Sequence, residues 1–391
     1  MKLWKAATIS WLRIVLFLLM TLLPFLCWCA GMGDFPEESV ENRKLAERPA
    51  FELSDMSSFP QAYENYFNDH LPLRSRMVSL NSMWNIRMTK TSSNSSVIIG
   101  ENDWLFYHNE RDGDPIGQYT GRLAWDQEKL EAVAQHVVEI RDQLAERGIE
   151  FVLFFAPNKE RMYHQYMPGL YGKPGETYPL RQLTDYLHGQ TDVRIINSED
   201  VLQQAIDNHP EDTYYYKYDT HWNALGAYIG SRVLLREIGI DMPEYLDLEI
   251  TYEYSGQSDR DLANMLNLGS WYGTDRVYQL HGYSEENEAS IWDLIPSLEA
   301  FNDTIPVEHN AGDPRKLVMV RDSFCTAMLP YVSSVFKSSD FIKINTYTPE
   351  KLLALEPEIV VLELVERNIE SLAGFEVQAS GAEMGGIPHG A

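Results

Sequence analysis

The stretch Phe151-Val152-Leu153-Phe154-Phe155 is an unbroken apolar run, and it decides the fold class of this chain. A strand buried on both faces of a parallel sheet has this composition, whereas a half-buried antiparallel strand alternates apolar and polar residues. Helical stretches separate this run from others of the same kind, at 193–196, 317–320, 341–344 and 359–364. The alternation predicts an α/β fold with a mainly parallel sheet flanked by helices.

The expected helices are marked by spacing and by caps. Asp126 is expected to cap a helix that ends at Gly148, because apolar residues recur between them at intervals of three and four. A helix is also expected at 224–238, and partly helical spacing covers 59–88. Two short strands are expected at 97–100 and 103–107, joined by a turn.

Composition excludes several classes of function. The chain has 391 residues, of which 44% are hydrophobic, so it can bury a sizeable core. Its formal net charge is −26, and a body so acidic repels phosphate backbones, which argues against nucleic-acid binding. The cysteines are Cys27, Cys29 and Cys325, so the body beyond the N-terminal segment holds a single thiol and no internal disulfide.

The N-terminal segment 1–33 is expected to anchor the chain in a membrane. Residues 14–30 carry no charge and as a helix would span roughly 25 Å, close to the ~30 Å hydrocarbon core of a bilayer. Basic residues precede this segment and an acidic stretch follows it, which predicts a cytoplasmic N-terminus and an extracytoplasmic body. The alternative is a cleaved signal peptide, although no clear Ala-x-Ala site follows the apolar segment.

The remaining organisation follows from composition. Residues 34–58 are polar and acidic and are expected to form a stalk or linker. The catalytic domain is expected at 59–376, with an insertion at about 245–315, and residues 377–391 are expected to form a flexible tail.

Two short motifs carry the candidate chemistry. Asp219-Thr220-His221 precedes an expected helix, and Ser323 follows the apolar run at 317–320. These residues supply the three groups of a nucleophilic triad: a serine to attack, a histidine to take its proton, and an aspartate to fix the imidazole tautomer. Ser323 is expected at the carboxyl end of a strand, before a helix at 324–329 that Pro330 interrupts. Free N–H groups at that helix start, those of Ser323 and Phe324, are expected to hold an oxyanion.

Each motif also has an ordinary structural reading. Asp322 or Ser323 can simply cap a helix, and so can Asp219, with His221 packed beside Trp222. Metal binding by Asp219 and His221 is disfavoured because no third ligand lies at a suitable spacing nearby.

An ordered set of motifs along the body carries a family resemblance, and the set is more specific than any one motif. Its blocks are Tyr66-Phe67-Asn68-Asp69-His70 with Arg74, Gly100 through Trp104-Leu105-Phe106-Tyr107, Ala156-Pro157-Asn158-Lys159 with Tyr163, Asp219-Thr220-His221-Trp222 with Gly226-Ala227-Tyr228, Asp261-Leu262-Ala263 with Met265-Leu266, Arg321-Asp322-Ser323-Phe324, and Pro357 to Val361 with Glu366-Arg367. With these blocks the sequence resembles the DHHW proteins and the alginate O-acetyltransferase-like members of the SGNH hydrolase superfamily.

The resemblance implies a flavodoxin-like α/β core in which the Asp-x-His motif precedes the serine. Asp219 and His221 match the Asp-x-His positions, and Ser323 matches the nucleophile. Two positions depart from the pattern: Arg321 stands where the superfamily favours Gly, and Thr220 stands where the family name expects a second His. Neither departure removes a triad group, but Arg321 leaves the shape of the oxyanion site open.

Further residues are candidates for the oxyanion site or the substrate cleft, each with an alternative structural role. Lys159 and Tyr163 follow the first long strand, and Lys159 is equally consistent with a salt-bridged loop residue. Asn158 is a candidate oxyanion donor, although an Asn after a Pro commonly belongs to a turn. Aromatic residues that can stack on sugars or pack in the core are Trp222, Tyr214, Tyr215 and Tyr216.

Together these features predict a membrane-anchored, extracytoplasmic O-acetyltransferase that acts on a surface polysaccharide through an acyl-serine and needs no metal or cofactor. The resemblance suggests a multispanning membrane O-acyltransferase as its acetyl donor. Three alternatives stay open: a carbohydrate acetylesterase with the same triad, a non-catalytic polysaccharide-binding scaffold, and a membrane-tethered structural protein.

Overall fold

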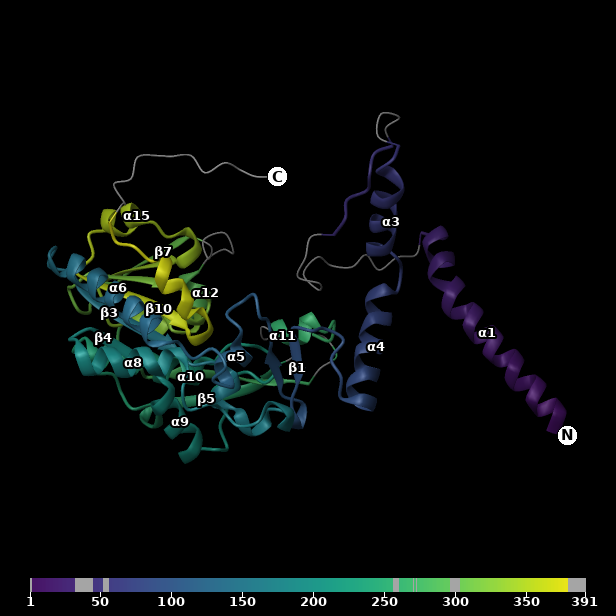
Figure 1. Ribbon diagram of the computed structural model, residues 1–391, viewed down its shortest axis with the longest axis horizontal. Coiled ribbons are helices and arrows are strands. Elements are labelled where there is room, and N and C mark those ends of the chain that lie inside the picture. The colour runs from purple at the N-terminus through teal and green to yellow at the C-terminus, as the bar shows by residue number, and fades with distance from the viewer. Residues whose placement is uncertain are drawn as a thin grey trace. The chain divides into compact units, whose positions relative to one another are not determined.

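The computed structural model describes residues 2–31, 45–51, 56–255, 260–269, 271, 273–295 and 303–378. The chain divides into two compact units, one of Met1–Ile99 with Asp259–Gly273 and one of Gly100–Ser258 with Thr274–Ala391. Figure 1 shows the elements of both units along the colour gradient. The expected linker at 34–58 and tail at 377–391 lie largely outside the described residues.

The smaller unit is mostly helical. Its elements are α1 (Lys2–Cys29), α3 (Phe59–Asp69), α4 (Arg74–Thr89), β1 (Val97–Ile99) and α11 (Asp261–Met265). The helical spacing expected over 59–88 is confirmed as two helices, and Leu73 with a φ of 65° lies directly before the second. None of the helices among the described residues is long and apolar enough to cross a membrane. The membrane-spanning helix expected from the sequence is therefore not shown.

The larger unit is built around a six-stranded sheet with the order β4-β3-β10-β8-β9-β7. Its strands are β3 (Glu150–Ala156), β4 (Arg194–Asn197), β7 (Thr304–Glu308), β8 (Leu317–Arg321), β9 (Ser338–Lys343) and β10 (Ile359–Val365). All neighbouring strands pair in parallel except β7, which pairs antiparallel with β9. The mainly parallel sheet expected from the apolar runs is confirmed. Strand β7 was not predicted; it contains Pro306 and lies at the sheet edge, where a missing N–H donor is tolerated.

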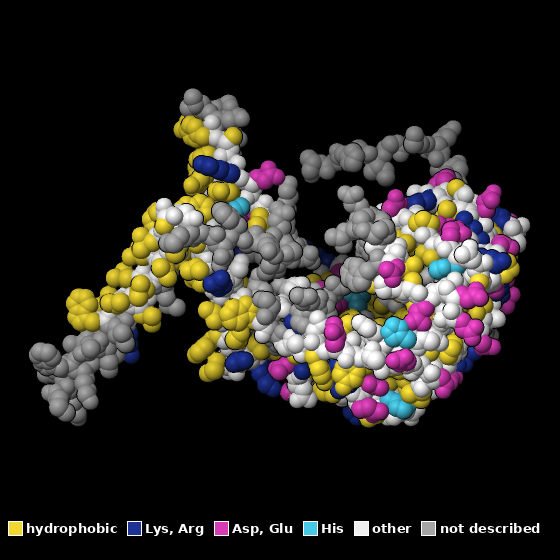
Figure 2. Space-filling model, turned by 180° about the vertical axis from the view of Figure 1, so that it is seen from behind, with side chains coloured by type: hydrophobic (Ala, Val, Ile, Leu, Met, Phe, Trp, Pro, Cys, Tyr) yellow, Lys and Arg dark blue, Asp and Glu magenta, His cyan; other side chains and the backbone are white. Residues whose placement is uncertain are grey.

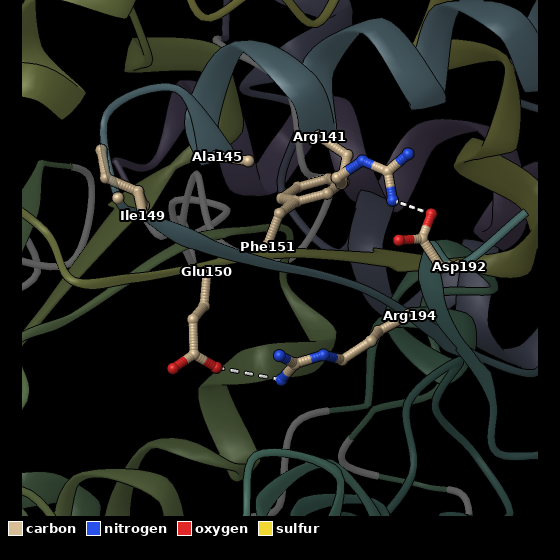
Figure 3. A pocket seen from close by; sticks show the side chains of 8 residues that line it. Arg141, Ala145, Ile149, Glu150, Phe151, Asp192 and Arg194 are labelled. Atoms are coloured by element: carbon tan, nitrogen blue, oxygen red, sulfur yellow. Dashed lines mark hydrogen bonds and ion pairs between the residues drawn. The ribbon is translucent and has the colours of Figure 1, made fainter.

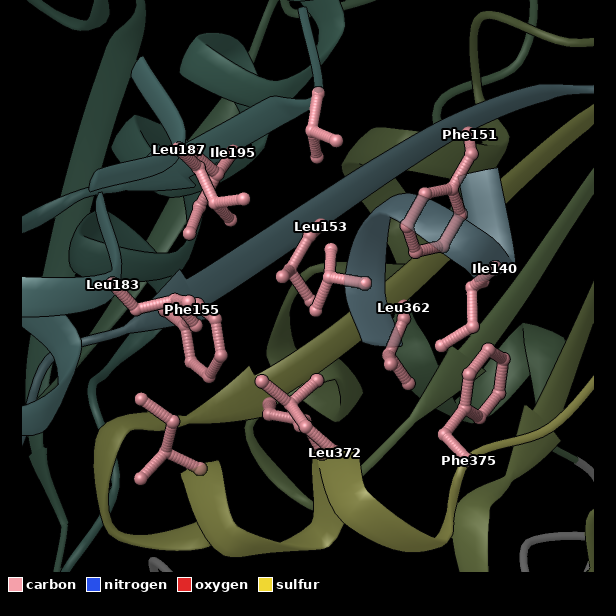
Figure 4. Close-up of a cluster of buried hydrophobic side chains, with 14 of the residues drawn as sticks. Ile140, Phe151, Leu153, Phe155, Leu183, Leu187, Ile195, Leu362, Leu372 and Phe375 are labelled. Carbon is pink, nitrogen blue, oxygen red and sulfur yellow. The ribbon is translucent and has the colours of Figure 1, made fainter. Parts of the chain in front are cut away.

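Helices cover both faces of this sheet. On one face, α6 (Gln127–Ala145) and α8 (Pro179–Gln190) pack on Phe151, Leu153 and Phe155 of β3, as Figure 4 shows in close-up. Asp126 caps α6 by accepting a hydrogen bond from the Lys129 N–H, as expected. On the other face, Phe154 of β3 meets α10 (Ala224–Glu237) and the preceding Trp222. Alternate residues of one apolar strand thus fill two cores.

Shorter elements complete the larger unit. They are β2 (Leu105–Tyr107), α5 (Pro115–Tyr119), α7 (Lys159–Met162), α9 (Glu199–Asn208), the antiparallel pair β5 (Glu249–Ser255) and β6 (Asp275–His281), α12 (Ile291–Leu294), α14 (Leu329–Ser333), α15 (Pro349–Ala354), and the 3₁₀ segments η2 (Glu101–Asp103), η3 (His164–Tyr166), η4 (Gly169–Tyr171), η5 (Tyr245–Asp247), η6 (Phe324–Ala327), η7 (Ile344–Thr346) and η8 (Glu366–Gly374).

The expectation of a helix from Phe324 that Pro330 interrupts is wrong. The segment after Ser323 is the short 3₁₀ turn η6, and α14 begins only at Leu329. Pro330 lies in the first turn of α14, where its missing N–H would have no intrahelical partner in any case. Consequently no α-helix begins at Ser323.

Candidate active site

The structure brings Asp219, His221 and Ser323 into one hydrogen-bonded chain. His221 Nδ1 lies 2.7 Å from Asp219 Oδ1, and His221 Nε2 lies 2.8 Å from Ser323 Oγ. Asp219 is buried, Ser323 is half-buried, and the His221 side chain is 28% exposed. The expectation that these residues converge across a hundred positions is confirmed. The geometry suits an imidazole that donates from Nδ1 to the carboxylate and accepts at Nε2 from the serine hydroxyl.

Each motif is placed by the element beside it. Ser323 follows β8 at the carboxyl end of the sheet, and the Asp-x-His loop leads into α10, which Asn223 caps by accepting from the N–H groups of Leu225 and Gly226. The buried indole of Trp222 donates to the Phe324 carbonyl over 2.9 Å and so joins the two motifs directly. Trp222 is therefore a structural link and offers no face to a sugar. Tyr214 and Tyr215 are likewise buried in the core.

Two buried charges hold the backbone of the loop that carries Asp219. The Lys159 ammonium donates to three carbonyl oxygens, those of Tyr216 at 3.1 Å, Lys217 at 3.3 Å and Asp219 at 2.6 Å. The Asp275 carboxylate, at the start of β6, accepts from the N–H groups of Lys217 at 2.8 Å and Tyr218 at 3.2 Å. We call Lys159 and Asp275 the loop clamp. Its two opposite charges bind the acceptors and the donors of one short segment, which fixes the position of Asp219.

Lys159 therefore differs from both roles considered for it. Its side chain is buried, with the ammonium 5.6 Å from the ring centre of Trp104 and 5.3 Å from that of Phe106. It neither lines a cleft nor forms a surface ion pair, because its three donors meet backbone carbonyls.

The turn that carries Ser323 is held by buried carboxylates. Asp322 accepts from the N–H of Phe324 at 2.8 Å and of Val365 at 2.7 Å, and from the Asn368 side chain at 2.9 Å. Glu363 on β10 accepts from the Asp322 N–H at 3.1 Å. Burial, together with the nearby Asp322 charge, raises the pKa of Glu363 well above its usual range.

These contacts change the expected oxyanion site. The Phe324 N–H already donates to Asp322, so it is committed within the turn and does not point to a bound oxyanion. The physical reason is that Asp322 makes a local bond to the residue two positions on, which competes with a helix start. Of the expected pair, the Ser323 N–H is the one left as a backbone donor.

The other candidate residues lie inside the protein. Asn158 is buried, where its side-chain oxygen accepts from the Arg367 N–H at 3.3 Å and its amide faces Gln118 at 3.4 Å. The buried Tyr163 hydroxyl accepts from the Tyr214 N–H at 2.9 Å, and its ring stacks on Trp104. Burial raises the pKa of Tyr163, which keeps the phenol neutral. Arg321 is fully buried, and its guanidinium donates to the Asp322 carbonyl at 3.2 Å. These three residues support the site from within.

Three residues of the site, Asp275, Glu363 and Asn368, were not predicted from the sequence. Glu363 had a visible signal, since it is the single acid of a strand that is otherwise apolar and buried on both faces. Asp275 and Asn368 had none, because they bind the backbone or an acid of a distant segment.

A charged pocket of about 310 Å³ lies at the amino ends of strands β3 and β4, away from the carboxyl ends where Ser323 lies (Figure 3). Its lining includes Glu150 and Arg194, the first residues of β3 and β4, whereas Ser323 lies two residues after Arg321, the last residue of β8. Arg194 pairs with Glu150 at 3.0 Å, and Arg141 pairs with Asp192. This pocket is thus separate from the candidate active site.

Comparison with known families places the chain in one of them. A family model described as "SGNH hydrolase-like domain, acetyltransferase AlgX" matches residues 97–294, about half of the chain. The chain belongs to this AlgX-type family. The matched segment contains Asp219 and His221 and ends before Ser323, and the larger unit has the SGNH-like α/β fold.

The AlgX-type chain is similar to several known proteins. It is 20% identical to the probable alginate O-acetylase AlgJ of Pseudomonas putida over 216 residues, which cover 55% of this chain and 52% of that protein. It therefore spans about half the length of that relative. Solved structures similar to it include Bacillus cereus PatB1, at 16% identity and a TM-score of 0.49 over 70% of this chain and 96% of that one. A DHHW family protein from Eubacterium siraeum matches at 15% identity and a TM-score of 0.49, over 72% and 99% of the two chains.

Proposed function

We propose that this protein is an O-acetyltransferase that acetylates hydroxyl groups of a polysaccharide through an acyl-enzyme on Ser323. The observation that carries the proposal is the hydrogen-bonded chain from Asp219 through His221 to Ser323, with bonds of 2.7 and 2.8 Å. Membership of the AlgX-type family supports the acetyl group as the transferred unit. The similarity to an alginate O-acetylase supports a polysaccharide as the acceptor.

In the first half-reaction, Ser323 Oγ attacks the carbonyl carbon of an acetyl ester donor while His221 Nε2 takes the hydroxyl proton. The tetrahedral intermediate then collapses, the bond from the acetyl carbon to the donor oxygen breaks, and His221 returns the proton to that leaving oxygen. The buried Asp219 carboxylate stabilises the imidazolium that exists between these two proton transfers. The products are an acetyl-serine and the free donor alcohol.

In the second half-reaction, a sugar hydroxyl of the acceptor attacks the acetyl-serine. His221 takes the proton of that hydroxyl, the bond from the acetyl carbon to Ser323 Oγ breaks, and the proton passes to the serine oxygen. The enzyme is regenerated and the sugar carries the acetyl ester. If water attacked instead, the same residues would make the protein an acetylesterase, so the acceptor alone separates these two activities.

Transfer and hydrolysis are distinguished by the product that the acetyl-serine gives: acetylated sugar in transfer, free acetate in hydrolysis. Purified residues 34–391 should be given an acetyl ester with and without oligosaccharide, while donor alcohol, free acetate and acetylated sugar are measured together. A transferase gives acetylated sugar that rises with acceptor as acetate falls. Acetate release that the acceptor leaves unchanged would instead make the protein an esterase, and no turnover at all would favour the binding scaffold.

We also propose that residues 1–33 tether the protein to a membrane with its body outside, where a multispanning O-acyltransferase supplies acetyl groups. The uncharged run at 14–30, the basic residues before it and the acidic stretch after it support this arrangement. Protease added to intact cells should then degrade the body while a membrane-bound N-terminal fragment stays protected. A soluble form that begins near residues 31–34 would show cleavage instead.

A further inference from the structure

The Arg367 guanidinium lies on two aromatic rings beside the nucleophile. Its central carbon is 5.3 Å from the ring centre of Phe324, the residue after Ser323, and 5.6 Å from that of Tyr107. The Phe324 ring also lies beside the imidazole of His221, at a ring separation of 4.8 Å. The buried Phe324 ring thus neighbours both the guanidinium and the imidazole of the triad, while Arg367 itself is half-buried.

The backbone around Arg367 is fixed to the active site. Its N–H donates to Asn158 Oδ1 at 3.3 Å, and its carbonyl accepts from the Gln118 side chain at 3.4 Å. The next residue, Asn368, donates to Asp322 at 2.9 Å and so reaches the turn that carries Ser323. A side chain on this anchored segment has little freedom to move away from the site.

This guanidinium has no partner for its charge within the part of the chain that the structure describes. It makes no hydrogen bond and no ion pair there, whereas Arg161 pairs with Glu366 at 3.4 Å and Arg315 pairs with Asp313 at 2.7 Å. The buried Glu160 lies close enough for the Arg367 charge to act on it, but its carboxylate accepts from the Tyr107 N–H instead. In a chain of net charge −26, whose acidic side chains are scattered over the face in Figure 2, an unpaired cation beside a nucleophile is unusual.

We propose that Arg367 binds a carboxylate of the acceptor, so that this site prefers a polysaccharide built from acidic sugars. The proposal rests on the transferase function above. The two aromatic rings that Arg367 contacts accept no conventional hydrogen bond, so the guanidinium N–H groups can donate to a ligand, and their fork matches the two oxygens of a carboxylate. Arg367 is thereby a specificity residue: it touches the acceptor near Ser323 but takes no part in the proton transfers.

The test compares one acceptor in two forms, a uronic-acid oligosaccharide and the same oligosaccharide with its carboxyl groups reduced to alcohols. The ratio of kcat/KM for the acidic over the neutral form measures carboxylate recognition. For the unaltered protein we expect a ratio of about ten to a hundred, the range for a hydrogen bond to a charged group. Arg367→Gln should bring the ratio close to one, and Arg367→Lys should retain part of it because the charge remains while the fork is lost.

The matched control is Arg147→Gln, which makes the same charge change on an exposed arginine. Arg147 lies just before β3, at the amino ends of the strands and away from Ser323. It should keep the ratio of the unaltered protein. A ratio that Arg367→Gln leaves unchanged, with either acceptor slowed equally, would make Arg367 a purely structural residue and overturn the proposal. A ratio near one in the unaltered protein overturns it too. Failure of the transferase function is seen separately, as turnover that survives Ser323→Ala.

Discussion

Lys159→Met is expected to slow catalysis although Lys159 touches no reacting atom. Methionine has nearly the length of lysine and keeps the packing on Trp104 and Phe106, but it removes all three bonds to the loop carbonyls. Each buried carbonyl that loses its donor costs about 1–3 kcal/mol. Because methionine has no charge to bury, the variant also avoids the cost of burying an ammonium, which offsets part of the loss over the three carbonyls. We expect a net loss of about 2–4 kcal/mol in the free energy that holds the loop in place.

The kinetic consequence follows from the position of the shortest bond. The Asp219 carbonyl, 2.6 Å from the ammonium, belongs to the residue whose carboxylate orients His221. A displacement of about 1 Å at a catalytic group can cost about a hundredfold in rate. We therefore expect kcat for acetyl-ester turnover to fall by about a hundredfold, with a much smaller change in KM, because the change acts on the triad and not on substrate contacts.

A double-mutant cycle with Asp219→Ala separates positioning from general damage. If Lys159 acts through Asp219, Lys159→Met should cost little further rate once the carboxylate is gone. Lys173→Met is the control, since it removes the same charge from an exposed side chain and should leave kcat unchanged. The reasoning is refuted if Lys159→Met keeps kcat within about threefold, or lowers it equally in both backgrounds.

Three further results are expected. Asp219→Asn should lower kcat by about 10⁴-fold, because the amide permits the wrong imidazole tautomer, and steady-state turnover of an acetyl ester measures this loss. Burial raises the pKa of Glu366 from 4.5 to about 7, so its stabilising contribution is full below pH 4.5 and is lost as pH rises through about 7. Relative to Glu366→Gln, the unaltered protein should lose up to about 3 kcal/mol of unfolding free energy from pH 4.5 to 8 in urea titrations, and parallel curves would contradict this. Cys325→Ala should leave activity within a few-fold and thiol reagents should not label the folded protein, because Cys325 is buried and burial raises the pKa of its thiol.

The sheet was predictable because burial on both faces leaves a direct trace in the sequence. The five apolar runs became β3, β4, β8, β9 and β10, with shifts of a few residues at their ends. β7 left no such trace, since Thr304-Ile305-Pro306-Val307-Glu308 is short, alternates in polarity and contains a proline. Its pairing with β9 is a tertiary contact at an edge, which local patterns do not record.

The convergence of Asp219, His221 and Ser323 was predictable because their side chains carry the reactive groups, and a side chain is visible in the sequence. The loop clamp was not predictable, because Lys159 and Asp275 bind backbone carbonyl and N–H groups. Every residue has such groups, so the sequence does not show which of them are bound. The same reason explains the error at Phe324, whose N–H is taken by Asp322 two residues earlier. Of the aromatic residues considered for sugar stacking, Trp222, Tyr214 and Tyr215 are buried, and each can be, because its polar atom donates to a carbonyl inside the core.

The central claim is that an acetyl group passes through Ser323, and trapping the acyl-enzyme tests it most directly. The protein should be mixed with an acetyl ester in the absence of acceptor, quenched in acid within one turnover, digested and mapped by mass spectrometry. The account predicts acetyl on the peptide that contains Ser323, its loss when acceptor oligosaccharide is added before the quench, and none in Ser323→Ala. Acetyl found instead on Cys325, or labelling of Ser323 that an acceptor never discharges while product still forms, would contradict the account.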